Sequence, residues 1–499
     1  MTFTPVIAGV AQYTGSRQAS KPLDPLALMT LTSGAAVEDS GCAKLLEAID
    51  AVFVANIVSW TYADICSLLG QSLGIKSKDN RYSSIGGNTP QKFVNEAALA
   101  IETGKARAVL ITGAEAAYAV RRADKGQVSL GWPPKTEPLY YSDEEKPGFT
   151  DTEAVYEVFA PTLAYAYLEN ALRAAKNRSL ANHEKLMGKI CGQLSKIASQ
   201  NPYSWDKTPR TAEEITSPGP QNRMVCYPYT MRMSANIHVD QSASIIMTSR
   251  QLADELGIAA SKLVFPTGGA TLENIWFVTQ RPTLHDAPAL KEAARLALEQ
   301  SGTRIDEIAF FDFYSCFPWA VEAAWDALLL SEDDPRPISL TGGLPYFGGP
   351  GSNYTLHAIC AAAEKIRANP EQKALVTALG WYNTKWSAGV YGAKPGRHPF
   401  AEVNTGPVQQ QLLKHTLPEP EPEPEGALKI ETYAIVHDST GLPQRATVMG
   451  RLENGRRALA RVKGDPGFFS ELEKKELVGA VGNVSHDKEG GLNWLELTN

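Results

Sequence analysis

The sequence predicts an α/β fold in which one unit occurs twice, followed by a small β-barrel. Adjacent glycines occur at Gly86-Gly87 and again at Gly348-Gly349, each time before a helical pattern that leads to an apolar run. Alternating proline and glutamate at 417–425 then divide these halves from a C-terminal segment of short strand-like runs. These observations indicate two similar halves and an appended domain.

The first half alternates strands and helices. Strands are expected at 6–10 and 51–54, and Asn88-Thr89-Pro90 is a helix-start signal because proline is favoured at the first helical position. Apolar residues then follow the helical period at positions 93, 97, 98 and 101. The run AVLITG at 108–113 is typical of a buried strand.

The second half repeats this order. Pro350 and Asn353 open a helix with apolar positions at 356, 359, 360 and 366, and the run ALVTALG at 374–380 is again an apolar strand. A glycine pair before a helix leaves backbone N–H groups open to a ligand. Both loops are therefore candidate binding elements.

The domain boundaries follow from these patterns and from composition. Residues 1–118 and 235–265 form the first half, with a helix expected at 251–256, and 119–234 form a mostly helical loop domain that caps it. Residues 266–416 form the second half, 417–426 a linker, and 427–499 the C-terminal domain. The linker supplies no apolar residue from 418 to 425, which predicts that it holds the last domain only as a spacer.

The C-terminal domain is expected to be a small β-barrel of the OB type. Strand-like runs at 428–436, 445–452, 457–462 and 492–497 are short, and Asn454-Gly455 is a turn signal between two of them. A helical pattern covers 466–478. Proline and glutamate in alternation prevent both helix and sheet in the preceding linker.

Composition excludes several classes of function. The chain has 499 residues, 43% of them hydrophobic, so it can bury a large core. A net charge of -7 without a basic stripe gives no basis for nucleic-acid binding. The N-terminus lacks a signal-peptide pattern and no apolar run approaches the ~20 residues that span a bilayer, so a cytoplasmic protein is expected. Six cysteines without CxxC or Cys/His spacing indicate neither disulfides nor a metal site.

From about residue 5 to 415 the chain resembles the thiolase superfamily. Gly113-Ala114-Glu115 resembles the Gly-Met-Glu that closes a core strand of that family, and counting back from it places the family's nucleophilic cysteine at Gly87. Gly342-Gly343-Leu344 and Gly348-Gly349-Pro350 resemble the family's histidine loop, with Gly349 at the histidine position.

A third motif carries the same resemblance. The segment DFYSCF at 312–317 is similar to the His-Asp-Cys-Phe segment of sterol-carrier-protein thiolases, with Tyr314 at the histidine and Cys316 at the acid/base cysteine. The last family loop, Cys-x-Gly, corresponds to Gly380-Trp381-Tyr382, which contains no thiol. The chain is most similar to the thiolase-like proteins of type 1, which carry an extra C-terminal domain.

The resemblance implies a five-layered α/β/α/β/α fold and an acetyl-CoA acetyltransferase-like protein that binds an acyl-CoA. Because the nucleophile position is glycine, it implies that ordinary thiolase activity is absent, and that Gly87→Cys with Gly349→His would restore weak thiolysis. No metal or redox cofactor is implied beyond coenzyme A in the substrate. Thiolases are usually dimers, so a homodimer is possible. A monomer is also possible, because the extra domain could cover the dimer interface.

Two classes of function remain. One is a non-covalent aldolase or lyase acting on a CoA thioester in lipid or sterol metabolism, similar to steroid side-chain aldolases that work with an OB-fold partner, with Tyr314 and Cys316 as catalytic groups. The other is a non-catalytic CoA-ester binder or scaffold. In both, the residues expected at the ligand are Gly86, Gly87, Asn88, Tyr346, Gly348, Gly349, Asn353 and Tyr354.

Structural explanations of the same residues also stay open. Gly87 and Gly349 fit a backbone requirement for glycine as well as a ligand role. Cys316 also fits a buried apolar filler, and Tyr314 an anchor to a backbone carbonyl. Other residues could contact a ligand, but packing or a solvated surface explains them equally well. They are His238 and Asp240, the lysines Lys185, Lys189 and Lys196, and Trp381, Lys385 and Trp386.

Overall fold

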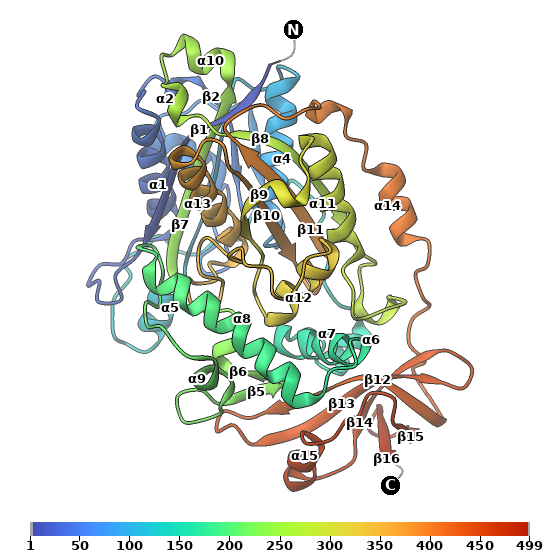
Figure 1. Ribbon diagram of the computed structural model, residues 1–499. Helices are drawn as coiled ribbons and strands as arrows, with labels where there is room; N and C mark the ends of the chain where they lie inside the picture. The colour runs from blue at the N-terminus through green and yellow to red at the C-terminus, as the bar shows by residue number, and fades with distance from the viewer. Residues whose placement is uncertain (1–2, 498–499) are drawn as a thin grey trace.

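In the computed structural model, which describes residues 3–497, each half forms one β-sheet (Figure 1). The first sheet has the order β1-β7-β4-β2-β3, and the second has the order β8-β11-β10-β9. The bounds of the strands are β1 Pro5–Thr14, β2 Ile49–Val54, β3 Asp79–Tyr82, β4 Ala108–Ala116, β7 Asp240–Ser249, β8 Phe265–Glu273, β9 Ile308–Asp312, β10 Lys373–Gly380 and β11 Lys385–Gly392.

Two helices form a central layer between the sheets. Helix α4 (Thr89–Glu102) follows the first glycine pair, α13 (Tyr354–Ala368) follows the second, and each contacts strands of both sheets. Both helices are rich in alanine, because a helix enclosed on two sides has room only for small side chains where it meets the sheets. The predicted repeat of glycine pair, helix and strand is confirmed.

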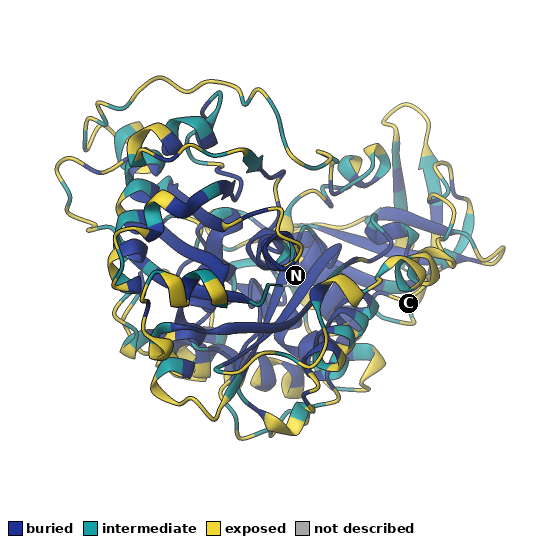
Figure 2. Cartoon of the chain, turned by 90° about the horizontal axis from the view of Figure 1, so that it is seen from above, coloured by how far each residue is buried: buried dark blue, intermediate teal, exposed yellow. Residues whose placement is uncertain are grey.

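The remaining helices of the two halves complete the layers. Helix α1 (Pro25–Ser40) covers β1, β4 and β7 on the outer side, and α11 (Pro288–Ser301) covers β8 and β11. The order α/β/α/β/α is therefore confirmed, and Figure 2 shows that the buried residues lie in these central elements. Shorter elements are α2 Leu45–Ala48, α3 Ile65–Leu73, α10 Arg250–Glu255, α12 Pro318–Ala327 and α14 Gly406–Leu413.

The loop domain lies below the two sheets in Figure 1 and joins them to the C-terminal domain. Its two long helices, α7 and α8, pack against α12 of the second half. Its elements are α5 Ala117–Asp124, α6 Asp151–Val155, α7 Pro161–Ala175, α8 Leu180–Gln200, α9 Ala212–Thr216, β5 Met224–Tyr227 and β6 Tyr229–Thr230.

The C-terminal domain contains a closed five-stranded barrel, which confirms the predicted small barrel but adds a strand at 481–487 that was not named from the sequence. The strands follow the order β13-β14-β16-β15-β12, and a further pairing between β13 and β12 closes the ring. The helix α15 ends at Leu472, earlier than the helical pattern suggests. The bounds are β12 Gly426–His437, β13 Pro443–Leu452, β14 Arg457–Val462, α15 Pro466–Leu472, β15 Val481–Asp487 and β16 Leu492–Leu497.

The expectation that this domain is held only by a spacer is wrong. Strand β12 pairs with β5 of the loop domain, so the hairpin β5-β6 extends the barrel sheet. The buried Arg457 donates hydrogen bonds to the carbonyl oxygens of Thr279 (2.8 Å) and Arg281 (2.7 Å). Ala434 and Met449 belong to the same hydrophobic core as the loop domain. The barrel is thus joined to the rest by sheet, core and hydrogen bonds, none of which the linker composition reveals.

Among residues 3–497, no helix is both long enough and apolar enough to cross a lipid bilayer.

Candidate functional site

The two glycine loops meet at one cavity of about 510 Å³. Gly86 and Gly87 reach it from the start of α4, and Gly349, Gly351 and Ser352 reach it from the start of α13. The loop after β9, the loop after β10 and helix α7 of the loop domain complete the wall, with side chains that include Tyr314, Cys316, Phe317, Trp381, Tyr382 and Tyr165. Both halves and the loop domain therefore contribute to the same site.

Hydrogen bonds lock the two loops together. The N–H of Gly86 donates to Ser352 Oγ (3.1 Å), and Thr355 Oγ1 donates to the carbonyl oxygen of Gly87 (2.9 Å). Asn353 Nδ2 donates to the carbonyl oxygen of Gly113 (2.7 Å). Among residues 3–497, no acceptor is hydrogen-bonded to the N–H of Gly87. The loops therefore hold each other and leave one backbone donor unused at the cavity.

Tyr314 fills the space in front of Gly87. A Cβ atom at residue 87 would lie 2.2 Å from the Tyr314 hydroxyl oxygen and 2.6 Å from the Leu379 carbonyl oxygen, far inside contact distance. The Tyr314 ring packs edge-on against Tyr354, with the ring centres 5.6 Å apart. Burial raises its pKa well above the usual value, and its backbone N–H donates to Thr377 Oγ1 (3.0 Å). A neutral phenol thus stands where a side chain at 87 would project.

Cys316 lies on the same wall as a neutral thiol. Burial raises its pKa to about 12, and an interaction with the Tyr165 hydroxyl offsets this only in part. Tyr165 itself donates to the carbonyl oxygen of Trp381 (2.9 Å). At neutral pH Cys316 can therefore donate a proton but is not a thiolate nucleophile.

Two of the expected ligand residues are tyrosines that point elsewhere. The hydroxyl of Tyr354 is hydrogen-bonded to Thr341 Oγ1 (2.6 Å) and donates to Asp312 Oδ1 (3.1 Å). The hydroxyl of Tyr346 is buried beside Cys191 and has no hydrogen-bond partner among residues 3–497. Neither lines the cavity.

The other expected ligand residues divide in the same way. Asn88, Gly348 and Asn353 stand behind the cavity wall, whereas Gly86, Gly87 and Gly349 line it. Gly348 has φ 121 and packs against Gln241. Asn353 bridges the two halves through its bond to Gly113, so its role in the structure is to join them.

Two buried carboxylates, Asp312 and Glu115, belong to motifs quoted from the sequence but were given no role there. Asp312 Oδ2 accepts hydrogen bonds from the N–H groups of Leu340 (2.8 Å) and Thr341 (3.0 Å), and burial raises the pKa of this carboxyl. Glu115 accepts from the N–H groups of Val58 (2.8 Å) and Ser59 (2.8 Å). Each of these carboxylates directly follows an apolar run in the sequence. That pattern could have identified them, because a buried carboxylate needs hydrogen-bond donors around it.

The loop after β10 places the Trp381 indole at the cavity, and the backbone of this residue has an unusual conformation. Trp381 has φ 57, a conformation that residues other than glycine rarely adopt. Lys385 and Trp386 do not line the cavity: Lys385 Nζ donates to the Ile85 carbonyl oxygen (2.6 Å), and Trp386 Nε1 donates to Asn383 Oδ1 (2.7 Å). Lys189 pairs with Asp333 on the surface.

The geometry opposes the repair hypothesis at residue 87 and not at residue 349. A cysteine at 87 would overlap a backbone oxygen and the Tyr314 ring, neither of which moves cheaply. A Cβ at 349 has no neighbour nearer than 3.4 Å. We therefore expect that rebuilding a thiolase site with Gly87→Cys and Gly349→His would also require a smaller residue at 314.

Comparison with known proteins identifies relatives of the whole chain and of its last domain. A family model described as the thiolase-like protein type 1 additional C-terminal domain matches residues 407–489. The crystal structure of a monomeric SCP2-thiolase-like protein type 1 from Mycobacterium smegmatis is similar over 99% of both chains, with 30% identity and a TM-score of 0.85.

More distant structures share the fold alone. An Ltp2–ChsH2(DUF35) aldolase is 17% identical with a TM-score of 0.59, over 78% of this chain and 98% of its own. An acetyl-CoA acetyltransferase from Syntrophomonas wolfei is 14% identical with a TM-score of 0.54, over 79% of this chain and 100% of its own. No curated protein sequence matches the chain.

Proposed function

Because the chain belongs to the SCP2-thiolase-like proteins of type 1, we propose that it binds an acyl-CoA thioester at the Tyr314 cavity without forming an acyl-enzyme. The supporting observation is the position of the Tyr314 hydroxyl, which occupies the space that a nucleophilic side chain at residue 87 would need. The phenol then meets the thioester as a hydrogen-bond donor, together with the free N–H of Gly87.

The walls of the cavity favour an apolar acyl group. Phe317, Leu344 and Leu379 line its interior, and Val58 and Ile237 stand at its mouth with 58% and 59% of their surface exposed. Two cations close to His238, which follows Ile237 in the chain, suit the phosphates of coenzyme A. The pKa of His238 is lowered first by burial and then by the charges of Arg121 and Lys125.

The reaction that this arrangement fits is cleavage or formation of a carbon–carbon bond next to the thioester. When the bond between Cα and Cβ of a β-hydroxyacyl thioester breaks, its electron pair becomes an enolate on the thioester oxygen. The Tyr314 O–H and the Gly87 N–H would stabilise that oxygen, and Cys316 would return a proton to Cα. Hydrogen-bond donors of this kind act because the charge develops in the transition state.

A non-catalytic carrier of CoA esters is the second candidate, and one observation favours it. The ionisable side chains on the cavity wall are Tyr165, Tyr314, Cys316 and Tyr382, and burial raises the pKa of each, so all are neutral near pH 7. Within the described part of the chain, residues 3–497, no carboxylate, histidine or lysine lines the cavity to remove the hydroxyl proton of a substrate. An aldolase would have to take that proton with water or a partner protein.

Native mass spectrometry of the protein purified from its own host tests the binding, because a CoA ester should be retained. If neither purified protein nor protein mixed with medium- and long-chain acyl-CoAs binds a CoA ester, the proposal is wrong. For an active preparation, Tyr314→Phe should lower kcat by about 10²- to 10⁴-fold with nearly unchanged affinity. Tyr346→Phe, a buried tyrosine outside the cavity, is the matched control. If the protein retains a CoA ester but does not turn it over, the result supports the non-catalytic carrier of CoA esters.

The relative from Mycobacterium smegmatis is described as monomeric, and we propose the same state for this chain. A cytoplasmic location and the absence of a cofactor other than coenzyme A belong to the same proposal. Analytical ultracentrifugation of the full chain tests the oligomeric state.

A further inference from the structure

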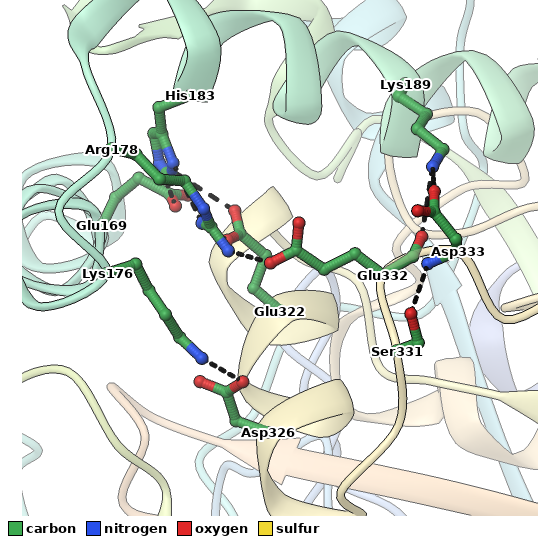
Figure 3. A network of polar contacts seen from close by, with 10 residues as sticks. All are labelled: Glu169, Lys176, Arg178, His183, Lys189, Glu322, Asp326, Ser331, Glu332 and Asp333. Atoms are coloured by element: carbon green, nitrogen blue, oxygen red, sulfur yellow. Dashed lines mark hydrogen bonds and ion pairs between the residues drawn. The ribbon is translucent and has the colours of Figure 1, made fainter.

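A cluster of buried ionisable residues lies behind the cavity wall, where the loop domain meets the second half. Glu169 on α7, His183 on α8 and Glu322 on α12 have exposed fractions of 0%, 1% and 2%. Figure 3 shows the three side chains pointing toward one another from three helices. One ligand atom from each lies within 4.8 Å of the others, so a metal ion and a shared proton are the two arrangements to distinguish.

Glu169 is fully hydrogen-bonded as a carboxylate. His183 Nε2 lies 2.8 Å from its Oε1, and the Tyr229 hydroxyl donates to its Oε2 at 2.6 Å. Tyr229 and His183 come from different elements, and each directs one donor at one oxygen. Glu169 therefore carries the negative charge of the cluster.

Arg178 decides how His183 is protonated. Its Nη1 lies 3.3 Å from His183 Nδ1 (Figure 3). A guanidinium has only donors, so Nδ1 must accept and Nε2 must carry the ring hydrogen. A metal ligand needs a free lone pair on Nε2, and a metal-bound histidine normally donates from its other nitrogen. The contact with Arg178 therefore opposes a metal ion in this cluster.

Glu322 has one satisfied and one unsatisfied oxygen. Its Oε2 pairs with Arg178, whereas its Oε1 is buried, has no hydrogen-bond partner within residues 3–497, and lies 3.9 Å from His183 Nε2. If Glu322 were ionised, its buried Oε1 would lack a hydrogen-bond donor, which costs free energy. Its negative charge would also repel that of Glu169. A proton on Oε1 removes both costs.

We infer that Glu322 carries a proton in the folded protein near neutral pH, directed from its Oε1 toward Glu169, and that removal of this proton loosens the junction of α7, α8 and α12. The other charged groups facing the pair are Arg173 on α7, Arg178 before α8 and Glu332 after α12. Burial raises the pKa of Glu322 to about 8 and that of Glu169 to about 7, so Glu322 holds a proton more firmly than Glu169. Burial lowers the pKa of His183 to about 4, which keeps the ring neutral.

The junction is continuous with the cavity wall. The Tyr229 ring lies 4.9 Å from the ring of Phe317, and its hydroxyl also approaches the Tyr165 carbonyl oxygen at 3.3 Å. Tyr165 and Phe317, whose rings stack 4.7 Å apart, both line the cavity. The protonation state of the cluster thus acts on the shape of the cavity, which extends beyond the ligand binding proposed above.

The direction of the pH dependence follows from these values. A carboxyl whose pKa is higher in the folded than in the unfolded chain stabilises the fold at low pH, and this contribution is lost as pH rises through the folded value. For Glu322 the loss therefore begins near its ordinary pKa of 4.5 and is complete near pH 8. The lowered pKa of His183 acts in the opposite direction between about pH 4 and 6.5, so the loss due to Glu322 should be visible between pH 6.5 and 8.

Infrared difference spectroscopy and thermal unfolding of the ligand-free full chain test the inference. The wild type should show the carbonyl band of a buried carboxylic acid at pH 7, and its Tm should fall between pH 6.5 and 8. Glu322→Gln mimics the protonated form and should lack both the band and that fall. Glu332→Gln, which alters the more exposed carboxylate on the same Arg178, should keep both.

Two outcomes would overturn the inference. One is an unchanged acid band in Glu322→Gln. The other is stoichiometric divalent metal in the purified wild type, together with a rise in Tm on adding zinc that Glu322→Gln abolishes. If Glu322→Gln does not fold, Glu169→Gln replaces it, because removing the neighbouring charge and supplying an amide donor should let Glu322 ionise and abolish the band. A persistent band in that variant contradicts the inference equally.

Discussion

The two glycine loops carry the same dipeptide and face the same cavity, yet glycine is required for different reasons in each. In the first loop, a Cβ at Gly87 would meet the Tyr314 hydroxyl at 2.2 Å. In the second, Gly348 is the constrained residue, with φ 121 and Gln241 at 2.3 Å, whereas Gly349 has no neighbour within 3.4 Å of a Cβ. The two copies of the motif therefore have similar loops, but the glycine that cannot be replaced differs between them.

Gly348→Ala should have the largest effect on stability. The left-handed backbone and the overlap with Gln241, whose amide is held by the carbonyls of Phe347 and Tyr203, add their costs. We expect a loss of about 2–5 kcal/mol in the free energy of unfolding, measured by denaturant titration. Gly34→Ala, on α1 with open space around its Cβ, is the control and should lose nothing. Equal behaviour of the two variants would contradict the constraint.

Gly87→Ala should have the second-largest effect on stability. We expect it to lower the free energy of unfolding by about 1–3 kcal/mol, because the new methyl group would overlap Tyr314 and the Leu379 carbonyl. Combining it with Tyr314→Ala should recover part of that loss, because the two positions compete for one space. A double-mutant cycle on unfolding free energies measures the coupling. Strict additivity would show that Tyr314 does not fill the place of a side chain at 87.

Thr355→Val should cost about 1 kcal/mol, because the Gly87 carbonyl loses its hydrogen-bond donor while the shape of the side chain is kept. The bond links the two loops, so the variant should also weaken binding of any ligand that the cavity retains. Thr355→Ser keeps the hydroxyl and is the matched control. Calorimetric binding and denaturant titration of both variants check this, and a valine variant as stable as the serine variant would argue against the link.

Gly349→Ala should have the smallest effect and the opposite sign. Its backbone is outside the left-handed region and its surroundings accept a Cβ, so the smaller entropy of the unfolded chain should raise stability by about 0.4–1 kcal/mol. The same denaturant titration measures it. A loss comparable to that of Gly87→Ala would remove the distinction between the loops.

The candidate site was predictable from the sequence only in part. The glycine pairs and the DFYSCF segment pointed to Gly86, Gly87, Gly349, Tyr314 and Cys316, which the structure brings to one cavity. Tyr346 and Tyr354 flank the second pair in sequence but point away, because a residue beside a loop glycine has no fixed direction until the loop is packed. Tyr165 and Phe317 meet at the cavity from distant segments, and no local pattern marks that meeting.

The sequence by itself determined the repeat of glycine pair, helix and strand, and a small barrel after the linker, because hydrophobic period and turn residues act over short distances. Only the tertiary structure decided how the barrel is attached, why residue 87 lacks a side chain, and where the buried carboxyls of Glu169 and Glu322 meet. Those features depend on contacts between segments far apart in the chain, and the packing of a dense interior settles them atom by atom.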